Sequence, residues 1–264
     1  MTYDEQHVAG TVDRLLTDHG IVGTLTPDQT NLLDQFHAGG TDAVDRMIQP
    51  LGLTAADRVL DVGSGFGGPA RRIAQQTGAT VHGVDITAEY VDAATTLTAR
   101  STLAHLVTFE HVDIADHHPV LPYTAALSMH VQMNVADKRS WYREIAARVA
   151  PGAQFAVWDI CITGDHEITW PMPWSIDGRD SFLVTPDALR AAITGAGFEC
   201  VEWADEQAWV RDLFARTFAA GPPSGPGLAM LLDDGLTRTI NVAAAVDAGT
   251  ITVVRGRFTT PMLQ

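Results

Sequence analysis

The sequence has little or nothing of three features that would suggest particular functions. Lys138 is its only lysine, so that 17 basic residues stand against 32 acidic ones and the formal net charge is −15. Nucleic acids and anionic membrane surfaces would be repelled by this charge, and we expect neither as a partner. No run of residues approaches the roughly 20 apolar residues of a membrane span, so we expect no membrane insertion.

Cysteine is also scarce, with Cys161 and Cys200 the only two. Two cysteines are too few for a disulfide framework, and because each lies in an apolar run we expect buried free thiols. The first six residues are acidic and lack the basic and apolar regions of a signal peptide. We therefore expect a cytoplasmic protein whose acidity serves solubility, and the sequence leaves both a monomer and a homodimer open.

The sequence does contain a regular alternation of short apolar runs and helical stripes. The apolar runs predict strands at 58–62, 80–84, 107–112, 123–128 and 154–160. The stripes predict helices at 69–77, 88–100 and 138–149, the last of them stopped by Pro151-Gly152. Such alternation is typical of an α/β fold with a parallel sheet and right-handed crossovers.

The segments on either side of this alternation differ from it. Residues 1–55 show helical stripes and no strand, which predicts an N-terminal helical cap before a core at 56–264. Residues 161–184 have no periodicity, and loops of this length are usually functional. With the following region they predict lid insertions at about 161–184 and 206–248. Beyond the first lid we expect a helix from Thr185, strands at 198–203 and 250–258, and helices at 206–220 and 228–246.

A glycine-rich turn follows the first predicted strand, in the stretch Asp61-Val62-Gly63-Ser64-Gly65-Phe66-Gly67-Gly68-Pro69. Glycine can take positive φ and lets the backbone lie flush against a ligand. The helix that follows offers free N–H groups and the positive end of its dipole, and Pro69 suits its first turn. The turn therefore predicts a binding loop for a nucleotide-type cofactor.

Three acidic residues narrow the choice of cofactor. Asp85 ends the second predicted strand, from which a carboxylate can accept both ribose hydroxyls of an adenosine. Asp113 follows the third predicted strand, where it can meet an adenine amino group. Asp61, two residues before the first glycine, and the spacing Gly63-x-Gly65-x-Gly67 favour S-adenosylmethionine (SAM) over a dinucleotide, although Gly68 also completes the dinucleotide pattern.

With these residues the chain resembles the class I SAM-dependent methyltransferases from about residue 32 to 258, and most closely a bacterial branch that acts on small molecules such as natural products. The resemblance implies a Rossmann-like sheet of seven strands, mostly parallel with the last antiparallel, and helical cap elements. It implies that residues 59–65 line the methionine part of SAM, among them Asp61, Gly63, Ser64 and Gly65. Asp85 would hold the ribose and Ile86 would pack on adenine. Asp113 and Ile114 would receive the adenine edge.

Methyl transfer needs an acceptor within about 3–3.5 Å, exclusion of water and, for a hydroxyl or ammonium acceptor, a base. In open α/β sheets the reacting centre lies beyond the carboxyl ends of the strands. His130 follows the fourth predicted strand and is the candidate base, with a structural role or a cofactor contact as the alternative. Nearby, Met129 is expected to contact adenosine. Asn134 is expected to orient the substrate or to cap the loop.

Other candidates come from the flanking segments. His37 lies in a stretch that resembles a segment folding over the cofactor in this branch, and a plain helix C-cap role is equally open. Trp158 and Trp174 can form an aromatic wall for a substrate, although tryptophans more often pack in a core or lid. His117 and His118 suggest a metal site, but adjacent side chains rarely converge, so no metal is predicted.

The sequence thus predicts a SAM-dependent methyltransferase that methylates a small molecule in natural product biosynthesis and releases S-adenosylhomocysteine. Two alternatives stay open. A protein of the same fold can bind SAM and perform other chemistry, such as a cyclisation. An NAD(P)-dependent oxidoreductase fits less well, because we find no Tyr-x-x-x-Lys pair or similar hydride site in the sequence.

Overall fold

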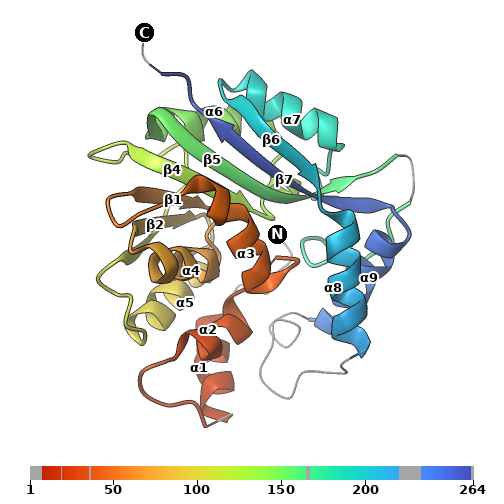
Figure 1. Cartoon of the computed structure of the whole chain (residues 1–264). Coiled ribbons are helices and arrows are strands. Elements are labelled where there is room, and N and C mark those ends of the chain that lie inside the picture. The colour runs from red at the N-terminus through yellow and green to blue at the C-terminus, as the bar shows by residue number, and fades with distance from the viewer. Residues whose placement is uncertain (1–7, 19, 36, 165–166, 220–232, 263–264) are drawn as a thin grey trace.

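The structure is a computed structural model that describes residues 8–18, 20–35, 37–164, 167–219 and 233–262. In these residues seven strands form one sheet in the order β3-β2-β1-β4-β5-β7-β6 (Figure 1). The strands β1 to β5 are parallel, and β7 is antiparallel to both β5 and β6. The prediction of a mostly parallel sheet with an antiparallel last strand is confirmed. The strands are β1 (Arg58–Val62), β2 (Thr80–Asp85), β3 (Val107–His111), β4 (Tyr123–Met129), β5 (Val149–Ile162), β6 (Glu199–Asp205) and β7 (Ile251–Thr259).

Helices cover both faces of the sheet. In Figure 1, α3, α4 and α5 lie on one face and α6 and α7 on the other, while α8 and α9 lie side by side near one end of β7. The helices are α1 (Val8–Asp18), α2 (Pro27–Asp34), α3 (Gly40–Ile48), α4 (Gly68–Thr77), α5 (Ala88–Ala99), α6 (Lys138–Arg148), α7 (Pro186–Gly195), α8 (Gln207–Ala219) and α9 (Gly235–Asp247), with short 3₁₀ helices η1 (Gln49–Leu51) and η2 (Gln132–Asn134).

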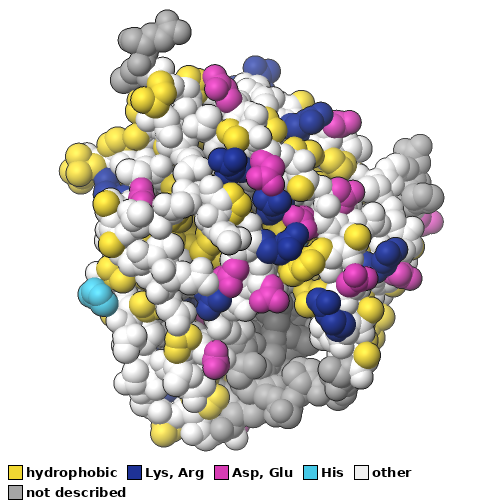
Figure 2. Space-filling model, viewed as in Figure 1, with side chains coloured by type: hydrophobic (Ala, Val, Ile, Leu, Met, Phe, Trp, Pro, Cys, Tyr) yellow, Lys and Arg dark blue, Asp and Glu magenta, His cyan; other side chains and the backbone are white. Residues whose placement is uncertain are grey.

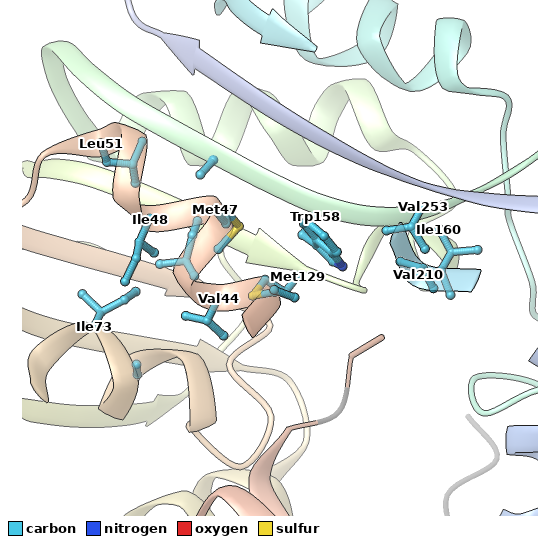
Figure 3. Close-up of a cluster of buried hydrophobic side chains, with 14 of the residues drawn as sticks. Val44, Met47, Ile48, Leu51, Ile73, Met129, Trp158, Ile160, Val210 and Val253 are labelled. Carbon is cyan, nitrogen blue, oxygen red and sulfur yellow. The ribbon is translucent and has the colours of Figure 1, made fainter. Parts of the chain in front are cut away.

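Side chains that alternate along the central strands fill two separate cores. Val59 contributes to the core beneath α3 and α4, and Leu60 to the core beneath α6 and α7. Figure 3 shows part of the first core, where Trp158 of β5 lies among side chains of α3, β4 and β7. Strands buried on both faces are apolar throughout, which is why continuous apolar runs predicted them well.

The junction between α6 and β5 differs from the expectation. The helix ends at Arg148, and Val149 is already extended, with φ −107° and ψ 154°. Val149 pairs with Tyr123, and the register shifts before Gln154. Pro151-Gly152 therefore lies within the irregular start of β5 instead of stopping the helix, because an early bulge accommodates a residue without an N–H.

The two cysteines have different environments. Cys161 is fully buried in β5, as expected, but Cys200 is exposed. The prediction for Cys200 was wrong because β6 is an edge strand, bonded only to β7 and covered less than the strands at the centre of the sheet. Its apolar neighbours Phe198 and Val201 suggested burial, but Glu199 and Glu202 beside them are typical of an edge strand.

The predicted caps keep the helical character expected of them. In the N-terminal region, α1 packs on α5 through a small apolar cluster that includes Leu16 and Leu97. The segment 163–184 begins two residues later than expected, since Cys161 and Ile162 still belong to β5. Of the helices expected at 206–220 and 228–246, α8 and α9 occupy most of the ranges, and residues 220 and 228–232 lie outside the described part. The division into cap, core and lids stays a prediction.

Opposite charges are mixed over the surface, as the face in Figure 2 shows. Charged side chains at and just below the surface form ion pairs, such as Arg46 with Glu206 at 2.8 Å and Arg255 with Glu202 at 2.7 Å. Within the described residues, the helices are all too short or too polar to cross a membrane.

Candidate cofactor and substrate site

A cavity of about 480 Å³ opens at the carboxyl ends of β1, β2 and β4. Its volume falls within the roughly 300–1,000 Å³ of small-molecule pockets, and its place is the one at which open α/β sheets bind ligands. The cavity is lined by Val62, Gly63, Gly65, Val84, Asp85, Ile86, Thr87, Tyr90, Val112, Asp113, Ile114, Met129, His130, Val131, Asn134, Val135, Trp141, Trp174, Asp180 and Phe182.

The glycine turn between β1 and α4 forms one wall of this cavity. Gly63, Gly65 and Gly67 have φ values of 76°, 52° and 77°, a conformation that favours glycine. A Cβ on Gly63 would lie 2.4 Å from Val131 Cγ2, whereas a Cβ on Gly65 would meet nothing within 4 Å. Gly63 therefore allows two chain segments to approach closely, and Gly65 keeps its wall of the cavity open.

Asp85 joins this turn to the end of β2. One carboxylate oxygen accepts the Gly65 N–H at 2.8 Å, and the other accepts the Thr87 N–H at 2.9 Å. Burial raises the pKa of Asp85, and these backbone hydrogen bonds oppose that rise. Thr87 is the N-cap residue of α5, but its side chain makes no capping bond.

Asp61 and Ser64 lie behind the turn instead of on the cavity wall. Both are buried, and neither Asp61 Oδ2 nor Ser64 Oγ has a hydrogen-bond partner among the described residues. Burial, and then the negative charge of Asp85, raise the pKa of Asp61 to about 7. Near neutral pH, therefore, Asp61 is ionised in only part of the molecules. A cation bound nearby would lower its pKa and increase the ionised fraction.

The residues expected around adenine lie together. Ile86, Asp113, Ile114 and Met129 all line the cavity. The structure adds Tyr90, in the first turn of α5, which the sequence analysis did not single out. Its place in the first turn of the helix that follows Asp85 was the available signal.

His130 lies on the cavity wall with unusual backbone geometry. Its φ is 53°, and its N–H donates to the Trp158 carbonyl at 2.9 Å. The ring Nε2 is buried and makes no hydrogen bond within the described residues. Burial, and then the neighbouring His37, lower the pKa of His130 well below its ordinary range, so the imidazole is neutral at neutral pH.

His37 is not part of the cavity lining but lies behind His130. The two ring centroids are 6.2 Å apart, and His37 Nε2 is 3.0 Å from the Gly40 carbonyl oxygen. Burial lowers the pKa of His37 to about 4, and the hydrogen bond to Gly40 opposes this shift. His37 thus ties the start of α3 to its preceding turn and supports the wall that carries His130.

The segment 163–184 contributes the opposite wall. Trp174 lines the cavity, and its indole N–H donates to Ser181 Oγ at 3.0 Å. Asp180 and Phe182 also line it, and the sequence analysis named neither. The only signal for them was their place in a long aperiodic segment, since their approach to the cavity depends on tertiary contacts.

Lysine and backbone contacts hold this wall in place. Lys138 Nζ donates to the carbonyls of Val135 and Phe182, and the Phe182 N–H donates to the Met133 carbonyl at 2.7 Å. The Asn241 side chain on α9 donates to the Pro171 carbonyl at 2.9 Å. The segment is therefore tied both to the loop after β4 and to α9.

Trp158 and Asp159 sit at the end of β5 and point to opposite faces of the sheet. Trp158 is fully buried outside the cavity lining, and its indole N–H donates to the Ala38 carbonyl at 3.0 Å (Figure 3). Asp159 accepts the N–H groups of Val131 and Gln132, each at 3.2 Å. It was missing from the candidates, and it fixes the loop that carries His130 and Asn134.

The cavity has a negative electrostatic character. Its lining contains the carboxylates of Asp85, Asp113 and Asp180 and, among described residues, no lysine or arginine. The sulfonium of SAM is a cation, and a cavity lined by carboxylates beside an open glycine turn suits it better than the pyrophosphate of a dinucleotide. The residues present therefore fit SAM.

Comparison with known proteins agrees with this geometry. Residues 60–155 match a family described as a methyltransferase domain, and the range includes the glycine turn, Asp85 and Asp113. The chain therefore contains a methyltransferase domain at residues 60–155. The match and the methyltransferase relatives support SAM as the cofactor over the dinucleotide alternative that the sequence left open.

Relatives include two bacterial proteins. The methyltransferase GfsG of Streptomyces halstedii is 29% identical over 140 residues, which are 52% of this chain and 50% of that protein. The 27-O-demethylrifamycin SV methyltransferase of Amycolatopsis mediterranei is 27% identical over 174 residues, 65% of this chain and 58% of that protein. The chain spans about half the length of the first curated relatives it matches.

Among solved structures, the [4+2]-cyclase SpnF has a similar fold. The TM-score is 0.62 with 21% sequence identity, and the match covers 99% of this chain and 98% of the other. At this identity the likeness establishes the fold alone.

Proposed function

We propose that this methyltransferase transfers the methyl group of SAM to a neutral or cationic small molecule bound between His130 and the aromatic wall of Trp174 and Phe182. One observation carries the proposal: a single cavity is lined both by the cofactor motif and by side chains of the 163–184 segment. The lack of lysine and arginine in the described lining argues against an anionic acceptor.

The predicted roles of the cofactor residues follow their places on the wall. The Asp85 carboxylate would accept the ribose hydroxyls, and Asp113 would accept the adenine amino group. Ile86, Ile114 and Met129 would pack on the adenosine rings. The turn at Gly63–Gly65 would lie along the methionine part, with Asp61 and Ser64 behind it. When bound, SAM supplies a methyl group already activated by its sulfonium.

His130 would position the acceptor. Its buried Nε2 has a free hydrogen-bonding site, so it can accept an O–H or N–H of the substrate or donate to an oxygen, depending on the tautomer. A histidine whose pKa lies far below neutral is a weak base. The proposal therefore assigns His130 orientation of the acceptor first and proton removal second, with Asn134 as the other polar group at this end.

The two bacterial relatives support natural product biosynthesis as the setting, since one is named for the methylation of a rifamycin. The acidic composition supports a cytoplasmic location without nucleic-acid partners, and either a monomer or a homodimer is compatible with it.

The test is an assay with isotopically labelled SAM and a panel of neutral, cationic and anionic acceptors that includes polyketides, aromatics and amines. We expect one class to gain the labelled methyl group with an equal amount of S-adenosylhomocysteine. His130→Ala should lower turnover at least tenfold with SAM affinity unchanged, whereas the exposed His105→Ala should leave both unchanged. Labelling confined to anionic acceptors, or wild-type turnover in His130→Ala, would contradict the proposal.

A second candidate is a rearrangement or cyclisation in which SAM stays intact. The weak basicity of His130 favours it, because such a reaction needs no proton acceptor for a methylated group. The fold is also similar to that of a cyclase. The same assay distinguishes the two candidates. A product of unchanged mass, formed without S-adenosylhomocysteine, would select the second candidate over methyl transfer.

A further inference from the structure

A second cluster of chemically reactive side chains lies outside the cavity lining, on β2, β3 and the segment that follows β3. His82, Glu110 and His117 bring one ligand-type atom each to within 4.8 Å of one another. Glu110 Oε2 is 2.8 Å from His117 Nδ1 and 3.4 Å from His82 Nε2. The rings of His82 and His117 stack with centroids 5.1 Å apart. Because zinc–ligand bonds of about 2.0–2.1 Å in a tetrahedron place ligand atoms about 3.3 Å apart, these spacings are close to those of a metal site.

Strand register explains why residues so far apart in the sequence converge. His82 pairs with Thr108, and Val84 pairs with Glu110, so His82 and Glu110 lie on the same face of neighbouring strands. His117 reaches them from the segment after β3. Arg148 of α6 holds that segment, because its Nε donates to the His117 carbonyl at 2.9 Å.

Both imidazoles are oriented by a partner on the far side of the ring. His82 Nδ1 lies 2.8 Å from Thr108 Oγ1, and His117 Nε2 lies 3.0 Å from Tyr123 Oη. A hydroxyl oxygen can accept as well as donate, so each ring can keep its proton on this side and aim a lone pair at Glu110. Protein ligands of metals are commonly oriented by such outer hydrogen bonds.

The site is also accessible. The His82 and Glu110 side chains are 24% and 48% exposed, whereas that of His117 is 6% exposed. An ion can therefore enter from solvent, meet two partly exposed ligands, and complete its coordination with the buried one and with water.

We propose that His82, Glu110 and His117 bind a divalent transition-metal ion, for which Zn²⁺ is the reference ion. Two imidazoles and one carboxylate form a ligand set suited to zinc and its neighbours and poorly suited to Mg²⁺ or Ca²⁺, which prefer oxygen. The sequence analysis considered His117 together with its neighbour His118 and did not find this set. The partners of His117 are instead His82 on β2 and Glu110 on β3.

The position of the site gives it a structural consequence. Glu110 and His117 bound the segment 111–116, and Val112, Asp113 and Ile114 of that segment line the cavity. A metal ion bound to Glu110 and His117 fixes both ends of this segment. It would therefore stabilise the wall expected to receive adenine, without contributing to any chemical step.

The test is calorimetric titration of the metal-stripped full chain with Zn²⁺, which should show one equivalent bound to the wild type. Glu110→Gln and His82→Asn should each weaken binding at least tenfold, and both positions are exposed enough for the fold to tolerate the change. Tyr123→Phe removes only an outer partner of His117 and should weaken binding by about 10–100-fold.

Matched controls come from the same residue types. Glu199→Gln alters an exposed residue of β6, and His118→Asn alters the exposed residue next to His117 in the sequence; both should keep wild-type affinity. Hydrogen exchange should slow in residues 111–116 when Zn²⁺ is added to the wild type but not to Glu110→Gln. Absence of stoichiometric binding, equal binding in Glu110→Gln and His82→Asn, or loss in His118→Asn would each overturn the site. Exchange unchanged by bound Zn²⁺ would overturn its effect on the segment.

Discussion

The Gly65 N–H donates to the Asp85 carboxylate over 2.8 Å, so the glycine turn after β1 is bonded to the acid that ends β2. Two parts of the cofactor motif, separated by 20 residues, thus hold each other in place before any cofactor contact. The remaining lone pairs of the carboxylate stay available for the hydroxyls of a ribose. This arrangement makes Asp85 both a ligand residue and a support for the turn.

Asp85→Ala should therefore weaken SAM binding by about 100-fold or more. Two hydrogen bonds to a charged group contribute roughly 1.5–3 kcal/mol each, and the turn also loses its support. Calorimetry with SAM measures the effect, and Asp92→Ala provides the matched control, because Asp92 is exposed on α5. Wild-type affinity in Asp85→Ala would remove Asp85 from the ribose role.

Alanine at the two glycines of the turn should have different effects. Both substitutions place a side chain at positive φ, which costs about 1–2 kcal/mol. Gly63→Ala adds a clash with Val131 and should lower the free energy of unfolding further. Gly65→Ala has room for its methyl group, so it should keep more stability and lose SAM affinity. Chemical denaturation with calorimetry separates the two, and equal losses of stability would contradict the assignment.

Asp61 should make SAM binding release protons near neutral pH. Its pKa is raised to about 7, so part of the population is protonated there, and the cationic cofactor would favour the anion. Calorimetry in buffers of different ionisation enthalpy should detect a fraction of a proton released at pH 7 and little at pH 9. The release should be absent in Asp61→Asn, and its persistence in that variant would assign it to another group.

The same raised pKa affects stability. Between about pH 4 and pH 7 folded Asp61 holds a proton that the unfolded chain has lost, so its contribution to the free energy of unfolding falls as pH rises. Over that interval the free energy of unfolding of the wild type should decline relative to Asp61→Asn. Denaturation at several pH values measures this difference, and parallel curves for the two proteins would contradict the shift.

The ion pair between Arg71 and Asp34 should matter far more than a surface pair. Their atoms are 2.8 Å apart, with side chains only 4% and 1% exposed. Arg71→Met leaves the Asp34 carboxylate buried without its partner and should cost about 3–5 kcal/mol. The exposed pair Arg179–Asp177 is the control, and Arg179→Met should cost no more than about 1 kcal/mol. Similar costs for both variants in urea denaturation would contradict the expectation.

The sequence predicted the central strands closely because burial on both faces leaves a continuous apolar run. The bounds of β1 agree with the prediction, and those of β2 and β3 differ from it by one residue at one end. Cys200 shows the limit of this signal, since its strand Glu199–Asp205 contains three acidic residues and lies at an edge. Edge position is a property of the whole sheet and is not encoded in apolar neighbours alone.

The candidate site was predictable where its residues follow strand ends. Asp85 and Asp113 lie on the cavity because parallel strands bring their carboxyl ends to one edge. Asp180 and Phe182 could not be placed, because Lys138 and the α9 contacts decide where their segment lies. Trp158 was expected to face a substrate, yet α3 and Trp209 enclose it, and its ring centroid lies 5.6 Å from that of Trp209.

Lys138 is the one lysine of the sequence, and its ammonium is shared by the carbonyls of Val135 and Phe182. A lysine-specific protease therefore has a single cleavage point in the chain, after Lys138, and this residue is only 6% exposed. Cutting requires the surrounding backbone to detach and extend, so the rate of this one cleavage measures how often the aromatic wall separates from the loop after β4.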